Sequence, residues 1–154
     1  MKTLRPPQTS DRRALLAGYR SGLEVKNAAH IKANGVDPHY EEFTLRYEVP
    51  ARIARYTPDF VFTHNGIVVE SKGIFPTADR HKHLLIKNQY PDLEVRFVFS
   101  NPNSRISKQS STTYADWCVK FGFRYAKLLT PVAWIHEDAT TRRMAALREA
   151  LGIL

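Results

Sequence analysis

Residues 57–73 read TPDFVFTHNGIVVESKG, and this stretch decides the fold that the sequence predicts. The Asn65-Gly66 dipeptide favours a type I′ turn, which connects the strands of a tight β-hairpin. β-branched and aromatic residues on both sides of the dipeptide favour strands over Asp59–His64 and Ile67–Gly73. The stretch therefore predicts two antiparallel strands joined by a two-residue loop.

This hairpin brings charged side chains to one face. A two-residue loop sets Asp59 opposite Lys72, and Glu70 shares their face because side chains alternate along a strand. Asp59 and Glu70 then lie diagonally across the ladder, about 7–8 Å apart at the backbone. Two such carboxylates can hold one divalent cation, and the lysine can hold a phosphate or a water, as metal-assisted phosphodiester hydrolysis requires. A solvated face with an ordinary Asp59–Lys72 ion pair explains the spacing equally well.

The apolar residues of the hairpin support this register. Four of them share the opposite face, which suits a core: Phe60, Phe62, Ile67 and Val69. A three-residue loop would turn Asp59 to the face opposite Glu70. The arrangement of the two carboxylates therefore depends on the length of the loop.

The elements around the hairpin alternate in type. Helices are expected over residues 21–34, 78–90 (with Thr77 as N-cap), 114–121 and 141–151, and further strands over 43–49, 93–100 and 123–127. This order predicts an α/β fold with a mixed β-sheet flanked by helices. Residues 50–58 begin and end with proline and contain no glycine, so they form either an edge strand or a stiff connection towards a second subunit.

Three polar residues on the expected helices have more than one explanation. Glu24 lies on the apolar stripe of its helix, where a carboxylate needs a partner, a metal or a cleft. It is also the fourth residue of a capping box that begins at Ser21. His81 and His83 do not share a helix face, which argues against a histidine metal site and favours phosphate contacts or a solvated face.

Composition limits the class of protein. The chain has 154 residues, 43% of them hydrophobic and 25% charged, which is typical of one folded domain. Its net charge is +8, and residues 1–20 hold five basic residues against one acid. Such a surface attracts polyanions, usually nucleic acid, although a merely soluble basic protein has the same charge. No apolar run reaches the roughly 20 residues of a membrane span, and the lone Cys118 is expected to be a buried thiol, so we expect a cytoplasmic protein.

Four blocks of sequence now become recognisable in their order and spacing. They are RSGLE at 20–24, YTPDF at 56–60, ESKG at 70–73 and DRHKHLLI at 79–86. With them, from about Arg20 to Glu137, the chain resembles the phage endonuclease I family. These proteins are Holliday-junction resolvases of the PD-(D/E)xK nuclease superfamily, which process phage DNA during recombination in the infected bacterial host.

The resemblance assigns roles to the site residues. It implies that Asp59, Glu70 and the backbone carbonyl of Ser71 bind Mg²⁺, for which Mn²⁺ substitutes, and that Lys72 is the catalytic lysine. Glu24 becomes a third active-site acid, which would help to place a second metal ion or its water. The implied activity is hydrolysis of four-way and other branched DNA by paired nicks. A sequence-specific duplex endonuclease on the same core, or a basic protein that binds branched DNA without cutting it, are the alternatives.

The resemblance also implies an organisation. It predicts a flexible basic arm over 1–18, a restriction-endonuclease-like nuclease domain over 19–137, and a C-terminal helix over 138–154. Residues 50–58 become the bridge of an intertwined homodimer, so that Glu24 of one chain completes the site of the other. The chain departs from the family at both ends, and residues 137–154 balance three arginines with three acids where a lysine-rich tail is expected. Candidates for phosphate contacts are Arg12, Arg13, Arg20, Arg80, Lys82 and Lys87.

Overall fold

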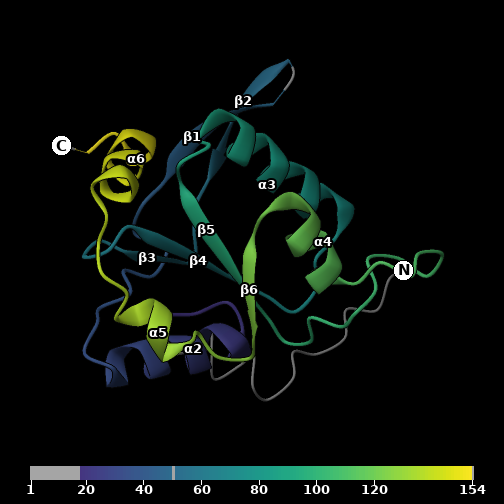
Figure 1. Cartoon of the computed structure of the whole chain (residues 1–154), viewed down its shortest axis with the longest axis horizontal. Coiled ribbons are helices and arrows are strands. Elements are labelled where there is room, and N and C mark those ends of the chain that lie inside the picture. Colours follow the sequence, from purple (N-terminus) through teal and green to yellow (C-terminus); the bar gives the residue numbers. More distant parts are fainter. Residues whose placement is uncertain (1–17, 50, 154) are drawn as a thin grey trace.

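The computed structural model describes residues 18–49 and 51–153 (Figure 1). Arg12, Arg13 and nearly all of the predicted basic arm lie outside the described residues. The helices are α2 (Gly22–Ala33), α3 (Thr77–Gln89), α4 (Tyr114–Phe121), α5 (Val132–Ile135) and α6 (Thr141–Leu151). The strands are β1 (Leu45–Val49), β2 (Arg52–Tyr56), β3 (Phe60–Phe62), β4 (Ile67–Lys72), β5 (Glu94–Phe99) and β6 (Arg124–Lys127).

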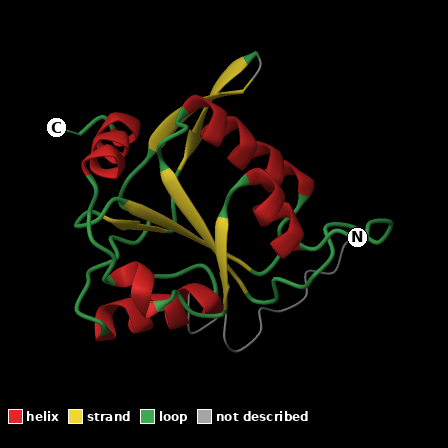
Figure 2. Cartoon of the chain, viewed as in Figure 1, coloured by secondary structure: helices red, strands yellow, loops and turns green. Residues whose placement is uncertain are grey.

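A four-stranded mixed sheet forms the centre of the molecule, in the order β3-β4-β5-β6. β3 and β4 are antiparallel, whereas β4, β5 and β6 run parallel, with α3 and α4 as the two connections. One face of the sheet packs against α3 and α4, and the other packs against α2 and α5 (Figures 1 and 2). The predicted α/β fold, a mixed sheet flanked by helices, is therefore confirmed.

The β3–β4 hairpin has a longer loop than the sequence predicts. Phe60 pairs with Val69 and Phe62 with Ile67, so the loop spans residues 63–66 and the expected pairing of His64 with Ile67 is wrong. Tertiary contacts explain the difference, because the buried Asn65 side chain donates to the backbone carbonyls of Trp134 and Glu137, each at 3.0 Å. A turn held from outside in this way does not have to adopt the type I′ geometry that its dipeptide favours.

The two-residue shift preserves the faces of the hairpin, since side chains alternate with a period of two. All four apolar residues expected on one face do lie together in a single core cluster: Phe60, Phe62, Ile67 and Val69. In the new register Asp59 lies opposite Glu70, whereas the sequence set it opposite Lys72. The two carboxylates are therefore direct neighbours.

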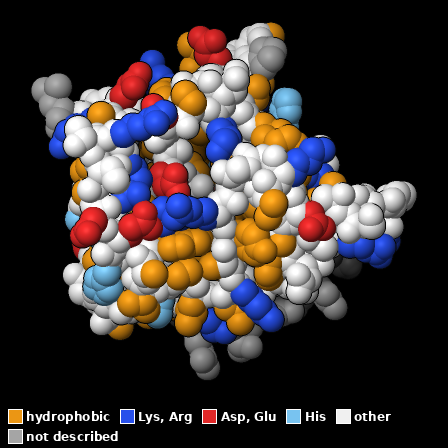
Figure 3. Space-filling view, viewed as in Figure 1, with side chains coloured by type: hydrophobic (Ala, Val, Ile, Leu, Met, Phe, Trp, Pro, Cys, Tyr) orange, Lys and Arg blue, Asp and Glu red, His pale blue; other side chains and the backbone are white. Residues whose placement is uncertain are grey.

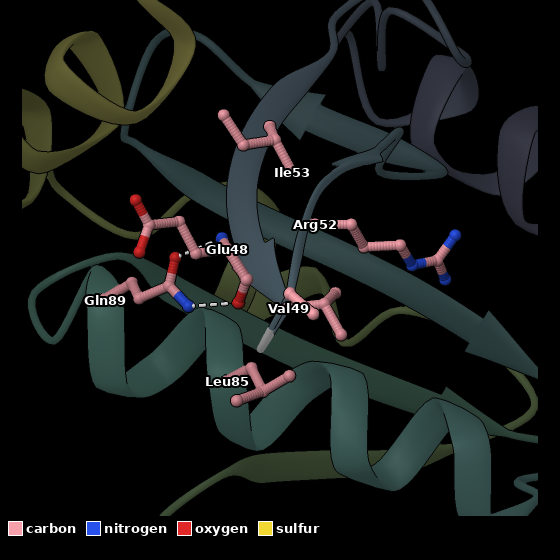
Figure 4. A pocket seen from close by; sticks show the side chains of 7 residues that line it. Glu48, Val49, Arg52, Ile53, Leu85 and Gln89 are labelled. Carbon is pink, nitrogen blue, oxygen red and sulfur yellow. Dashed lines mark hydrogen bonds between the residues drawn. The ribbon is translucent and has the colours of Figure 1, made fainter.

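A second, two-stranded sheet contains β1 and β2, which pair antiparallel from Leu45 with Tyr56 to Val49 with Arg52. Within this single chain, most of segment 50–58 is thus a strand. Gln89 of α3 anchors the hairpin by bonding to both backbone polar groups of Glu48 (2.5 and 2.6 Å). Figure 4 shows this contact at the edge of a pocket between the hairpin and α3.

Most helix predictions are confirmed. Ser21 caps α2, and Glu24 completes the capping box, while α4 begins at Tyr114 and ends before Gly122, which has a φ of 74°. Thr77 is not the N-cap of α3; Pro76 takes that position and makes no side-chain cap bond. The sequence missed α5, whose four residues are too few to show a helical period.

The buried thiol is also confirmed, because Cys118 is fully buried and burial raises its pKa to about 12. Among the described helices, none combines the length and the apolar character that crossing a membrane requires.

Candidate active site

The candidate residues meet at one end of the central sheet. Asp59 directly precedes β3, and Glu70, Ser71 and Lys72 end β4. β5 ends beside them, since Lys72 pairs with Phe99 in the parallel ladder. Crevices at the carboxyl ends of parallel strands are where open α/β sheets commonly bind ligands. The hairpin therefore places its acids at the edge of the sheet best suited to a site.

Asp59 and Glu70 hold each other through the neighbouring backbone. The Asp59 amide donates to Glu70 Oε2 at 2.8 Å, and the amide and hydroxyl of Ser71 donate to Asp59 Oδ2 at 2.9 and 3.1 Å. Glu70 is 2% exposed and Asp59 is half-buried. These hydrogen bonds therefore hold one oxygen of each carboxylate in the absence of a ligand.

Lys72 lies beside this pair but does not face Asp59. Its Nζ is 3.6 Å from Glu70 Oε1 and 3.2 Å from Oδ2 of Asp79, in the first turn of α3. The alternative of a solvated hairpin face with an Asp59–Lys72 pair is wrong, because Glu70 is buried and the Lys72 side chain is only 18% exposed. Asp79, which was not among the predicted site residues, holds the lysine in place.

Burial and charge set the protonation of the acids. Burial and the nearby Glu70 carboxylate raise the pKa of Asp59 to about 8. Burial would also raise the pKa of Glu70, but His83, Lys72 and the Asp59 amide outweigh it and lower that pKa to about 2. Near neutral pH the two carboxyl groups therefore share one negative charge, with the proton on Asp59.

Glu24 lies close to this pair in the same chain. Its Oε2 accepts hydrogen bonds from the amides of Arg20 (2.8 Å) and Ser21 (3.2 Å) and from the hydroxyl of Tyr40 (2.6 Å). Its charge contributes to the raised pKa of Asp59. The capping role is thus confirmed, and the same carboxylate lies near the site.

The oxygen donors fit a hard divalent cation. Two carboxylates at the end of β4, with the adjacent backbone carbonyl of Ser71, are the donor types that Mg²⁺ and Mn²⁺ accept. Within residues 18–49 and 51–153, no three His, Cys, Asp or Glu side chains lie close enough together to hold a metal ion on their own. A cation at Asp59 and Glu70 would therefore keep several water ligands, as Mg²⁺ usually does.

The structure separates the basic candidates into two groups. Arg20 is largely exposed and pairs with Glu41 at 3.0 Å, and Lys82 lies 3.7 Å from Asp79 beside the site. Arg80 is buried and donates to the carbonyl of Phe75, while Lys87 donates to Gly122 at the end of α4. Arg20 and Lys82 also pair with acids, but the exposure of Arg20 and the position of Lys82 beside the site make these two the better placed candidates for phosphate.

Among the described residues, the face of the molecule seen in Figure 3 shows no separate cluster of basic side chains that could bind DNA. Figure 3 shows acidic and basic side chains intermixed on it, next to apolar side chains. Four of the exposed apolar residues belong to the segment from β6 to α5: Tyr125, Leu128, Leu129 and Val132.

Sequence reasoning missed two side chains that support the acids. Tyr40 reaches Glu24 from a loop, and no local pattern marks it. His83 was expected on a solvated face or at a phosphate, but it is 1% exposed and its Nε2 lies 3.7 Å from Glu70 Oε1. Its spacing from the buried Ile86 on α3 was the available signal.

The sequence matches known nucleases over most of its length. The family model of phage endonuclease I matches residues 8–152. The chain is 43% identical over 122 residues to "Endonuclease I" of Escherichia phage T7, covering 79% of this chain and 81% of that protein. It is also 43% identical over 119 residues to "Endodeoxyribonuclease 1" of Enterobacteria phage T3, covering 77% and 78%.

Proposed function

Because this chain belongs to the phage endonuclease I family, we propose that it hydrolyses DNA phosphodiesters at four-way and other branched junctions with Mg²⁺. The observation that carries the proposal is the hydrogen-bonded pair of the half-buried Asp59 and the buried Glu70, with Lys72 beside it. A protein that only binds DNA has little use for acids that repel the phosphates. The pair therefore favours a nuclease over the architectural alternative.

Each side chain has a task that follows from its position. Asp59, Glu70 and the Ser71 carbonyl would hold the cation, which would polarise a phosphate oxygen and activate water when bound. Lys72, fixed by Glu70 and Asp79, would orient the attacking water and offset the negative charge that develops on the phosphate. Glu24, held by Tyr40, would place water at the edge of the site.

We further propose that the enzyme acts as an intertwined homodimer. α2 precedes the β1–β2 hairpin, so opening that hairpin beyond the Val49–Arg52 pair would carry α2 and Glu24 onto a partner chain. Ala51 has a φ of 80°, a left-handed conformation that costs an alanine about 1–2 kcal/mol and that an extended bridge would relieve. Two sites related by a two-fold axis suit paired nicks across a junction.

Branch shape and backbone charge would select the substrate. Contacts to phosphate position a protein on DNA without reading its sequence, and Arg20 and Lys82 are suited to such contacts. A cutting pattern that follows base sequence and ignores the branch point would instead support the duplex endonuclease alternative.

Cleavage of a synthetic immobile four-way junction tests the proposal. The junction and a matched linear duplex are incubated with Mg²⁺ or with chelator, and the products are resolved on gels. We expect paired nicks near the branch point only with Mg²⁺. The Glu70→Ala variant should bind the junction without cutting it, whereas Glu149→Gln, at an exposed carboxylate of α6, should cut normally. Cutting by Glu70→Ala, or metal-independent cutting, would refute the assigned site.

Subunit mixing tests the shared site. Glu24→Ala and Lys72→Ala subunits are inactive alone if both residues are needed, but a heterodimer of the two would contain one complete site when the hairpins are exchanged. We therefore expect nicking activity to return on mixing. Verified heterodimers that stay inactive would show that Glu24 acts within its own chain.

A further inference from the structure

His83 is buried in the middle of α3 without a hydrogen-bond partner. Its side chain is 0% exposed, and neither ring nitrogen bonds to any residue in the described part of the chain. Tyr56 and Phe97 enclose the imidazole with ring centroids at 5.2 and 4.8 Å, both nearly perpendicular to it. A buried polar group left unpaired costs about 1–3 kcal/mol, so an apolar side chain would be expected here if the position served packing alone.

The imidazole faces one of the two candidate metal ligands. Nε2 of His83 lies 3.7 Å from Glu70 Oε1, just beyond hydrogen-bond length. The other carboxylate oxygen, Oε2, accepts a hydrogen bond from the Asp59 amide. The hydroxyl of Tyr56 is also buried and unpaired among the described residues, and burial and Glu70 raise its pKa. Two buried donors without hydrogen-bond partners among the described residues therefore lie near the Glu70 carboxylate.

The imidazole can supply one hydrogen bond without carrying a charge. Burial lowers the pKa of His83, which favours the neutral ring, and a neutral imidazole has one N–H donor. A shift of about 0.7 Å would bring Oε1 from its present distance to a normal hydrogen-bond length. Carboxylates that bind metals are commonly held by donors of this kind, which fix their orientation.

We propose that His83 is a positioning residue whose Nε2–H binds Oε1 of Glu70 when that carboxylate turns to hold a divalent cation. His83 itself contacts neither the cation nor the DNA. This inference rests on the proposed function, because it takes Asp59 and Glu70 as ligands of the cation. It goes further by assigning metal affinity to a residue outside the site itself.

Three variants at this position separate positioning from packing. His83→Phe fills the aromatic enclosure but has no donor. His83→Gln places an amide N–H near the position of Nε2, whereas His83→Asn reaches only the position of Nδ1. The full-length protein, without DNA, is titrated with Mg²⁺ and with Mn²⁺ by calorimetry, and its thermal unfolding is followed with chelator.

We expect His83→Phe to lose about tenfold or more in metal affinity. Its melting temperature with chelator should stay the same or rise, because an unpaired polar group is removed. Gln should restore most of the affinity and Asn should not. The control is His64→Phe: His64 bonds to the Ile135 carbonyl at 2.7 Å across the other face of the sheet, and its loss should leave metal affinity unchanged.

Each outcome decides a different point. Wild-type affinity in His83→Phe, or equal losses in the Gln and Asn variants, would overturn the positioning role while leaving the proposed function intact. If His83→Phe does not fold, the Gln and Asn comparison alone decides. A wild-type protein that binds neither cation would contradict the proposed metal site, and the inference would fail with it.

Discussion

Replacing Asp59 with asparagine should stabilise the metal-free protein in a pH-dependent way. The native state keeps the proton of Asp59 up to a pKa of about 8, whereas the unfolded chain loses it near the ordinary value of 3.8. Between these values the native state binds one proton more than the unfolded state, so wild-type stability falls as pH rises. Asparagine is uncharged in both states, and its side-chain oxygen can still accept the hydrogen bond from the Ser71 amide.

The slope of this difference follows from linkage. One pKa unit corresponds to about 1.4 kcal/mol, so the advantage of Asp59→Asn should grow by up to about 1.4 kcal/mol per pH unit above pH 4. From about pH 5 to pH 7 that amounts to at most about 2.7 kcal/mol, or a melting-temperature difference of roughly 5–10 °C. The advantage should stop growing above about pH 8, where both states of the wild type are ionised.

Urea and thermal unfolding with chelator, at one fixed protein concentration, would measure this difference across the pH range. A matched control uses the Glu70→Gln background, which removes the charge that helps to raise the pKa of Asp59. The pH range over which the advantage grows should end at a lower pH there, but it should not vanish, because burial still raises the pKa of Asp59. A difference between Asp59→Asn and wild type that does not change with pH would refute the shared proton.

Three further predictions concern the same molecule. Because Asp59 must lose its proton to bind a cation, the apparent Mg²⁺ affinity should rise about tenfold per pH unit up to about pH 8. Calorimetry in two buffers should detect the release of about one proton per bound cation near neutral pH. Binding without proton release would contradict the raised pKa of Asp59. Arg96 is 1% exposed and forms ion pairs with Glu94 (2.8 Å) and Glu137 (2.6 Å). Arg96→Met should therefore lower the free energy of unfolding, measured in urea, by about 2 kcal/mol. An unchanged urea midpoint would show that these ion pairs do not contribute to stability. Ala51→Gly should favour the closed hairpin, because glycine adopts the positive φ of this position without strain. Sedimentation experiments should then show the monomer–dimer equilibrium shifted about twofold or more towards monomer. An unchanged equilibrium would exclude this position as the point of exchange.

The hairpin shows why part of the site could be predicted despite a wrong detail. The dipeptide Asn65-Gly66 suggested a loop of two residues, but the loop has four. An error of two residues leaves every side chain on its own face, so Asp59 and Glu70 remained together and the apolar residues remained in the core. Only the partner across the ladder changed.

Interactions within a few residues of each other were visible in the sequence. The capping box of Ser21 and Glu24, the end of α4 at Gly122, and the acids and lysine that end β4 depend on local spacing alone. These patterns determined the order of the elements, their faces and the chemical character of the site.

Interactions between distant segments appeared only in the tertiary structure. Lys72 bonds to Asp79 rather than Asp59, and Tyr40 reaches Glu24 across sixteen residues. His83 became a buried neighbour of Glu70 because α3 packs against the sheet at that point. Packing, which brings remote residues together and removes them from water, decides such partners and the pKa values that follow from them; no local pattern in the chain encodes that geometry.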